Sequence, residues 1–414
     1  MSTTKKITGN FIALFAMQIA NFLLPLLTIP YLGIVLGAEG FGLVMFSQAF
    51  IQYFVLLTDF GFNLSATRKI SVYREDSDKV SEIVSAVYLI KFVLLVISFI
   101  ILLVMTFFID KFHEHMYVYI LNFGVVIGQV LFPVWLFQGM EKMKYTTILN
   151  IVAKSIFTVL IFIIVKSQEE LYYVPLLNSL GFVVAGGIGF YIAIKQFNLR
   201  LAFPQKVIIR ESLRESGQFF ISRISVSAYT ISNTFLIGIF LGNTAVGYFS
   251  AAEKICNVIS TGVSTIVDAI YPHMARNKDI KIFKKIFFGV MVISTVGTIG
   301  AFMMSDFIIN LLFGSNYDVS VGILKIMIIA AYISIPSMLI GYPLLAAFGY
   351  LNYANYSVLI ASIFHILSLL IIAPSGNIYY ITAILILTQF IVLIIRLYGC
   401  RKKLNGVIFE NSRL

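Results

Sequence analysis

The sequence has little charge and little cysteine for its length. Of its 414 residues only 12% are charged, 59% are hydrophobic, and the mean hydropathy is +0.95. This composition excludes an ordinary soluble protein, and no stretch of the chain is polar enough to form a soluble domain. The two cysteines, Cys256 and Cys400, lie too far apart along the predicted topology to suggest a disulfide, and they say nothing about the redox compartment.

The sequence also lacks the motifs that carry catalysis. It contains no glycine-rich phosphate-binding loop ending in Lys and Ser or Thr, which argues against direct use of ATP. His113 and His115 lack the i, i+4 spacing of a zinc-binding helix. Asp76 and Asp78 could suggest a metal site for a nucleotide sugar, but they fall in a small charged turn with no domain to form a donor pocket. We therefore expect no enzymatic activity, no metal and no cofactor.

Long apolar segments dominate what is present. A membrane-spanning helix needs about 20 predominantly apolar residues. The connections are short, and the longest runs from Lys195 to Ser216. Met1 to Lys6 are polar and no small-residue cleavage site follows the first span, so we expect no removable signal peptide. The sequence predicts an all-α polytopic membrane protein with about 12 transmembrane helices, at residues 10–36, 42–62, 81–108, 116–138, 147–166, 172–194, 217–241, 246–272, 286–312, 321–347, 355–373 and 378–399.

Basic residues indicate how the chain crosses the membrane. The formal net charge is +11. Only Lys111 and Lys166 fall in the loops on one side of the predicted topology. Most other Lys and Arg residues fall on the opposite side, in the N-terminus, the loops 63–80, 139–146, 195–216 and 273–285, and the C-terminal end from Arg396 onward. The positive-inside rule then places both termini in the cytosol, and the charge is interpreted as an orientation signal rather than as a nucleic-acid-binding surface.

A short pattern recurs at an offset of 205 residues, close to half the chain. Leu36-Gly37 followed by Gly42 returns as Leu241-Gly242 followed by Gly247. Both copies fall in the outer turn between the first two spans of a six-span half. Six spans preserve orientation, so an axis along the membrane normal would relate the halves, which is a common transporter plan. We predict two six-helix bundles, residues 1–200 and 201–414, around a central polar cavity.

Segment 245–272 has membrane length, yet its polar side chains share one side of the helix. Advancing 100° per residue, Glu253, Lys254, Asn257 and Asp268 fall on that side together with four Ser and Thr residues. An ionisable group at bilayer depth costs roughly 2.5–3.5 kcal/mol, so it normally faces a bundle interior or a wet cavity. We expect this side to line a hydrated path, although Lys254 could instead pair locally with Glu253.

Polar residues of other spans could face the same cavity. Each has a second interpretation, because amides and hydroxyls also hold membrane helices together. Arg223 and Lys154 could snorkel to the headgroups, and Lys91 could form a structural ion pair. Pro25 and Pro30 remove backbone hydrogen bonds and predict a bend in the first span. The candidates are Gln18 and Asn21 in the first span, Gln52 and Asp59 in the second, Lys91 in the third, Lys154 in the fifth, and Arg223 and Asn233 in the seventh.

Four stretches of the sequence resemble one family. They are PLLTIPYLGIVLGAEGFG at 25–42 with DFGFNLSATR at 59–68, WLFQGMEKMK at 135–144, FFISR at 219–223 with NTFLIGIFLG at 233–242, and VGYFSAAEK at 246–254 with YPHMAR at 271–276. Together they resemble the Wzx-type polysaccharide flippases of the multidrug/oligosaccharidyl-lipid/polysaccharide exporter superfamily, over roughly residues 5–285. One departure is Ile34, because members often carry Arg shortly after Pro-Tyr-Leu.

The resemblance implies a flippase in the bacterial inner membrane that moves undecaprenyl-pyrophosphate-linked O-antigen or related repeat units from the cytosolic to the periplasmic leaflet. Its partners would be this lipid-linked oligosaccharide, membrane lipids, and an O-antigen polymerase and chain-length regulator, with no nucleic acid. Basic residues would attract the pyrophosphate or acidic sugars, amides would bind sugar hydroxyls, and acids would balance charge or bind a coupling cation. The basic candidates are Arg223, Lys254, Lys91 and Lys154, the amides Gln18, Asn21, Gln52, Asn233 and Asn257, and the acids Glu253, Asp268 and Asp59.

Three other functions stay open at this point. A cation-coupled multidrug antiporter of the same superfamily would favour an acidic pocket, whereas bases outnumber acids within the predicted spans. A sugar polymerase or glycosyltransferase would need a catalytic constellation, usually in a sizeable outer loop, and the outer loops are short. A passive channel would not require two related bundles.

Overall fold

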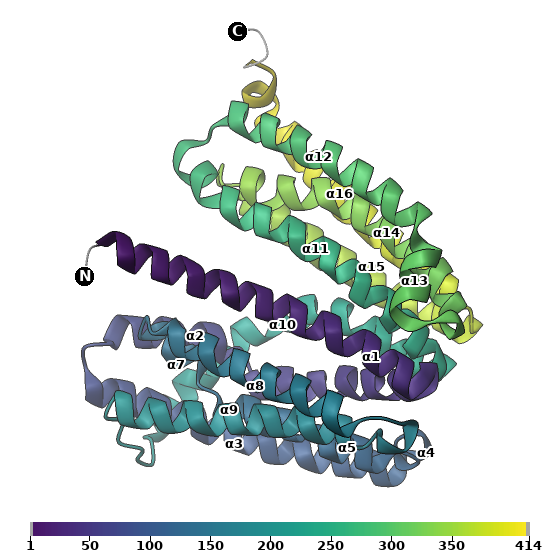
Figure 1. The fold of residues 1–414 in the computed structure, drawn as a ribbon. Helices are drawn as coiled ribbons and strands as arrows, with labels where there is room; N and C mark the ends of the chain where they lie inside the picture. The colour runs from purple at the N-terminus through teal and green to yellow at the C-terminus, as the bar shows by residue number, and fades with distance from the viewer. Residues whose placement is uncertain (1–2, 411–414) are drawn as a thin grey trace. The chain divides into compact units, whose positions relative to one another are not determined.

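The computed structural model describes the backbone of residues 3–410 and the side chains of residues 24, 27–220 and 231–404. Within these residues it contains helices and turns and no β-strand, which confirms the predicted all-α fold (Figure 1). The elements are α1 (Thr3–Asp59), α2 (Phe62–Tyr73), α3 (Ser77–Phe108), α4 (Asp110–His113), α5 (Met116–Asn122), α6 (Gly124–Leu131), α7 (Val134–Gly139), α8 (Met143–Ile164), η1 (Gln168–Glu170), α9 (Tyr173–Gln196), α10 (Lys206–Leu241), α11 (Asn243–Asn277), α12 (Ile280–Met303), α13 (Ser305–Phe313), η2 (Ser315–Tyr317), α14 (Asp318–Leu339), η3 (Ile340–Ala346), α15 (Leu351–Ile372), η4 (Ala373–Ser375) and α16 (Ile378–Glu410).

Ten helical segments among the described residues are long and apolar enough to cross a membrane, and a shorter apolar helix covers Ile231–Leu241. Each predicted span falls within one or more of these elements, so the polytopic membrane fold is also confirmed. The region 63–80 was expected to be a loop and is mostly helix α2 instead. Phe62, Ala66 and Ile70 bury one side of that helix, which explains why it forms despite its basic residues.

Two compact units make up the fold. The first contains residues 1–36 and 44–224, and the second contains residues 37–43 and 225–414. Helix α1 therefore contributes a short piece to the second unit, and α10 begins in the first unit and ends in the second. In the second unit α14 packs against α11, α12 and α16, and α16 also packs against α15.

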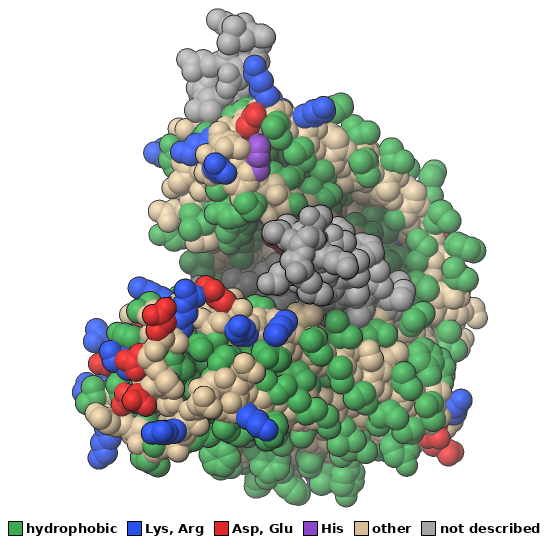
Figure 2. Space-filling view, turned by 60° about the vertical axis from the view of Figure 1, so that its left-hand side comes forward, with side chains coloured by type: hydrophobic (Ala, Val, Ile, Leu, Met, Phe, Trp, Pro, Cys, Tyr) green, Lys and Arg blue, Asp and Glu red, His purple; other side chains and the backbone are tan. Residues whose placement is uncertain are grey.

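The cores of the units are apolar, and so are the outer flanks of their helices. Trp135, Phe62 and Phe137 are fully buried in the first unit, and Leu345 and Met274 are fully buried in the second. On α12 the exposed side chains Phe288, Ile293 and Val296 are large and apolar as well, because unsatisfied polar groups are not tolerated in lipid. Figure 2 shows hydrophobic side chains over much of the visible surface, with Lys, Arg, Asp and Glu gathered in limited areas. This distribution suits helices surrounded by lipid.

The turns of the repeated sequence pattern have matching backbone conformations. Gly37 interrupts α1 with φ 67° and ψ 177°, and Gly242 precedes α11 with φ 90° and ψ 179°. These φ values favour glycine, because a Cβ makes them strained. The break in α1 comes from Gly37, whereas the helix is continuous through Pro25 and Pro30, for which the sequence predicted a bend.

The repeated turns also pack against one another within the second unit. A Cβ added to Gly42 would collide with the carbonyl oxygen of Asn243, and one added to Gly247 would collide with that of Ala38. Asn243 follows Ala38 by 205 residues, the same offset that separates Gly247 from Gly42. The contacts are therefore reciprocal, as in an isologous interface between two related parts.

Candidate functional site

Helix α11 presents the polar side that the sequence predicted. Its apolar residues Val263, Val267 and Met274 are buried, and the helix packs against α14 and the π-helical segment η3. Asn257 and Asp268 lie exposed on the second unit. The polar side is thus turned away from the core of its own unit.

The hydroxyl groups on this side bond within their own helix. Thr261 donates to the carbonyl oxygen of Asn257 at 2.7 Å, and Thr265 donates to that of Thr261 at 3.0 Å. Ser264 donates to the same Thr261 carbonyl at 2.9 Å. Each hydroxyl oxygen keeps lone pairs that can accept a hydrogen bond from a ligand.

The charged pair on α11 is only partly buried. Glu253 and Lys254 are half-buried neighbours whose charges interact. The attraction between these two adjacent charges is compatible with both a local pair and a substrate contact, the two interpretations that the sequence left open. A cation beside a carboxylate at this depth can attract an anion while the carboxylate limits the local net charge.

Two predicted residues of the first unit also come together. Lys91 on α3 is 3% exposed, and Asp59 at the end of α1 is 7% exposed. Their charges attract each other in the interior of that unit. Burying two opposite charges in this way costs much desolvation free energy, and removing one of two such attracting charges is strongly destabilising.

The remaining candidates of the first unit lie elsewhere. Gln52 is exposed on α1, and Lys154 is half-buried on α8. One turn beyond Lys154, the Thr158 hydroxyl lies 3.2 Å from that of Thr28 and joins α8 to α1, so part of this polar stripe holds helices together. The side chains of Gln18, Asn21 and Arg223 lie outside the described residues, as does that of Pro25.

Asn233 occupies a buried hydrogen-bond network. Its side chain is 3% exposed, and its Oδ1 atom lies 3.2 Å from Nε2 of His365. Nδ1 of His365 lies 2.8 Å from the hydroxyl oxygen of Thr388. His365 was missed at the level of sequence, although a histidine in the apolar span 355–373 is itself a signal of function.

Arg396 is a second residue that sequence reasoning misplaced. It was counted with the basic C-terminal end, but its side chain is only 6% exposed inside the second unit. Its guanidinium donates to the Ser337 carbonyl oxygen at 2.7 Å and to the Ser357 hydroxyl at 3.0 Å. A Cβ on Gly341 would lie 2.5 Å from Nη1 of this arginine, so glycine leaves the room that the guanidinium needs. Arg396 thereby ties α16 to α15 and to the end of α14, where the π-helical segment begins.

The substitution R396K should lower the melting temperature of the purified protein. Lysine carries one ammonium group and cannot reproduce the planar guanidinium fork, so hydrogen bonds to buried oxygens would be lost at about 1.5–3 kcal/mol each. Thermal unfolding in detergent measures the effect, with R401K on the exposed surface of the same helix as the matched control. Equal melting temperatures for the two variants would contradict the tie described above.

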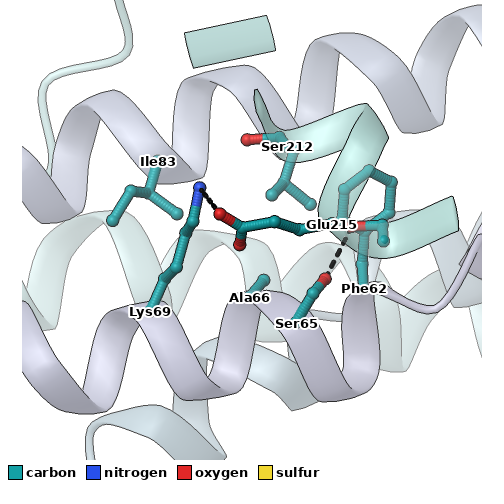
Figure 3. A pocket seen from close by; sticks show the side chains of 9 residues that line it. Phe62, Ser65, Ala66, Lys69, Ile83, Ser212 and Glu215 are labelled. Atoms are coloured by element: carbon teal, nitrogen blue, oxygen red, sulfur yellow. Dashed lines mark hydrogen bonds and ion pairs between the residues drawn. The ribbon is translucent and has the colours of Figure 1, made fainter. Parts of the chain in front are cut away.

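A polar anchor holds the start of α10 on α2 in the first unit (Figure 3). Lys69 pairs with Glu215 at 3.2 Å, and the Ser65 and Ser216 hydroxyls lie 2.6 Å apart. The cavity beside them, which Ser212 also lines, measures about 10 Å³ and holds at most a water molecule. This site therefore fastens helices and is too small for an organic substrate.

The acidic pair considered as a metal site has a structural use. Asp76 is the N-cap of α3, and its carboxylate accepts a hydrogen bond from the backbone N–H of Lys79 at 3.0 Å. An Asp at this position satisfies a helix donor that would otherwise lack a partner.

The apolar helices and the ionisable groups within them define a multi-pass α-helical membrane protein. The chain belongs to the family described as "Polysaccharide biosynthesis protein", which matches residues 7–278. A protein of Escherichia coli (strain K12) is 31% identical over 391 residues, covering 92% of each chain, and one of Shigella dysenteriae is 28% identical over 340 residues, covering 80% of this chain and 84% of the relative. Both are titled "Putative O-antigen transporter".

Two solved structures share the fold. "Lipid II flippase MurJ, inward closed conformation" has a TM-score of 0.75 at 13% identity, covering 94% of this chain and 87% of the other. An inward-facing multidrug resistance MATE family transporter of the MOP superfamily has a TM-score of 0.67 at 13% identity, covering 92% and 94%. At this identity the likeness shows the fold, and family membership rests on the sequence.

Proposed function

We propose that the protein is a flippase that moves undecaprenyl-pyrophosphate-linked O-antigen or related repeat units from the cytosolic to the periplasmic leaflet of a bacterial inner membrane by alternating access. Both termini would lie in the cytosol, as the loop charges predict. The relatives titled O-antigen transporters support this proposal. An O-antigen polymerase and a chain-length regulator would act on the repeat units after transfer.

The polar side of α11 is the observation that carries the proposal. A sugar chain is hydrophilic and its pyrophosphate is anionic, whereas the polyprenyl tail is apolar and can stay in lipid. A path for the head group therefore needs hydrogen-bonding groups and a cation at membrane depth. Asn257, Thr261, Thr265 and Lys254 supply both on one side of a membrane-length helix.

Roles follow from the chemistry of the side chains. Lys254, Arg223 and Lys154 would attract the pyrophosphate or acidic sugars, and Gln18, Asn21, Gln52 and Asn257 would bind sugar hydroxyls. Glu253 and Asp268 would balance charge or bind a coupling cation. Lys91, Asp59 and Asn233 are buried in the interiors of their units. They would therefore hold the helices that line the path in place and would not contact the sugar directly.

Leaflet transfer tests the proposal directly. Purified protein would be placed in liposomes with labelled polyprenyl-pyrophosphate oligosaccharide, and the label exposed to an impermeant reagent over time. We expect transfer that depends on the protein and is absent with an unrelated membrane protein. Absence of transfer with native substrate, with or without an ion gradient, would favour the drug-antiporter alternative.

The double variant R223A/K254A should slow this transfer by about tenfold or more. Charge-assisted hydrogen bonds contribute about 1.5–3 kcal/mol each, and about 1.4 kcal/mol corresponds to tenfold. The variant K281A removes an exposed lysine at the start of α12 and is the matched control. Unchanged transfer in the double variant would show that these cations do not bind the substrate.

A further inference from the structure

His365 is fully buried where three helices of the second unit meet. It lies on α15, its Nδ1 atom is 2.8 Å from Oγ1 of Thr388 on α16, and its Nε2 atom is 3.2 Å from Oδ1 of Asn233 on α10. Both ring nitrogens thus face oxygen atoms in an apolar interior. Because a buried ring nitrogen needs a partner of the right kind, these oxygens determine which protonation states the site can accept.

The Thr388 oxygen acts as an acceptor toward the ring. Its hydroxyl proton is donated to the carbonyl oxygen of Ile384, one turn earlier in α16, at 2.8 Å. Nδ1 of His365 must therefore carry a hydrogen and donate it to Oγ1. This fixes the Nδ1–H tautomer whenever the ring is neutral.

The Asn233 side chain can accommodate either state of Nε2. With its carbonyl oxygen toward the ring, a hydrogen bond to Nε2 requires a hydrogen on that nitrogen as well, which makes the ring a cation. With the amide turned by 180°, its NH₂ group donates to a bare Nε2, and the ring is neutral. The two arrangements have nearly the same shape, because the oxygen and nitrogen of a carboxamide are almost equal in size.

We propose that His365 is a proton-binding site and that the Asn233 amide turns over when Nε2 gains or loses its proton. The proton comes from water and returns to water, and no covalent bond other than N–H forms or breaks. If the protein is the proposed flippase, the coupling ion is then a proton. This coupling role rests on the proposed function, whereas proton binding by His365 does not. Amide turnover would carry its effect to α10, the helix that continues into the first unit.

The hydrogen-bond contacts of the two ring nitrogens with Thr388 and Asn233 are made to oxygen dipoles. Helix α15 carries no acid, and its other ionisable side chains are Tyr353 and Tyr356. On α16 the ionisable groups next to Thr388 along the sequence are Tyr380 and Arg396, each about two turns away, and the sole acid is Glu410 at the helix end. On α10 they are Tyr229 and Arg223 toward the N-terminus from Asn233, and the acids Glu211 and Glu215 lie further off in sequence. Thr388 and Asn233 would thus help to stabilise the protonated ring.

Nuclear magnetic resonance of labelled histidine tests proton binding without any transport. The chain has four histidines, so ¹⁵N-histidine protein in lipid gives few signals, and H365Q identifies the one of interest. Between about pH 4 and pH 8 we expect this signal to change from a ring with two N–H groups to the neutral Nδ1–H form. A ring that stays neutral across this range would overturn the proposal.

Substitution of the partner provides a second readout on folded protein. In N233L the acceptor facing Nε2 is gone, so the conversion should shift to lower pH relative to the unaltered protein. The T388S variant keeps the hydroxyl and should leave the tautomer unchanged. An unmoved titration in N233L would show that the amide does not respond to the ring.

Liposome transfer tests the coupling. An imposed pH gradient should accelerate transfer by the unaltered protein, and this acceleration should be lost in H365Q. The control is H273Q, which changes an exposed histidine near the end of α11. Full acceleration in H365Q would overturn the coupling role. If the unaltered protein transfers nothing under any gradient, the proposed function fails, whereas the resonance titration still decides whether His365 binds a proton.

Discussion

Replacing Gly247 with alanine should destabilise the protein, although the same change at Gly262 of the same helix should stabilise it slightly. Glycine in a helix costs roughly 0.5–1 kcal/mol relative to alanine, so G262A gains this amount because nothing lies within 4 Å of its new Cβ. At Gly247 the new Cβ collides with the backbone of Ala38, which cannot rotate away as a side chain can. Overpacking of this kind costs about 1–3 kcal/mol or more.

Thermal unfolding of the purified variants in detergent, followed by size-exclusion chromatography, gives the comparison. The variant G42A should behave like G247A, because its Cβ collides with the Asn243 carbonyl in the reciprocal contact. Melting temperatures for G42A and G247A at or above that of G262A would show that the repeated turns do not pack closely. The melting temperature should fall for G247A and rise slightly for G262A. A general response to helix propensity would raise it in both variants, so the opposite signs identify the backbone collision.

Much of the fold follows from the length of the apolar segments. Each span was predicted because lipid requires a continuous apolar helix, and this requirement leaves few alternatives for a backbone. The break at Gly37 was harder to predict, because proline is the more familiar helix breaker, yet α1 stays helical through Pro30. Helix α2 was missed because its basic residues resemble a loop in composition, while its buried side is only a few residues long.

The candidate site was partly accessible from the sequence. The polar side of α11 could be predicted because eight polar residues share one side of a single helix, so no knowledge of a neighbouring helix was needed. Asn233, His365 and Arg396 differ, because their contacts join residues far apart in the chain. Helices that are apolar on every side carry no pattern that fixes which side faces a given neighbour. The partners of such buried groups can be read only from the packed structure.

Removing either Lys91 or Asp59 alone should destabilise the protein more than removing both charges together. The variant D59N leaves the Lys91 ammonium buried without its opposite charge, and K91M does the same to the Asp59 carboxylate. Loss of one partner of a buried ion pair costs about 3–5 kcal/mol, whereas replacing both by uncharged groups is often nearly neutral. Melting temperatures of the two single variants and of D59N/K91M form a double-mutant cycle that measures the interaction.

The same three variants decide between the two roles that the sequence left open for Lys91. If the pair is structural, the double variant should recover both the melting temperature and leaflet transfer. If Lys91 binds the substrate, the double variant should recover stability and still fail to transfer. The partly exposed pair Lys69–Glu215 is the control, because breaking it with E215Q should cost no more than about 1 kcal/mol. A D59N/K91M variant as unstable as the sum of its single variants would show that the two charges do not interact.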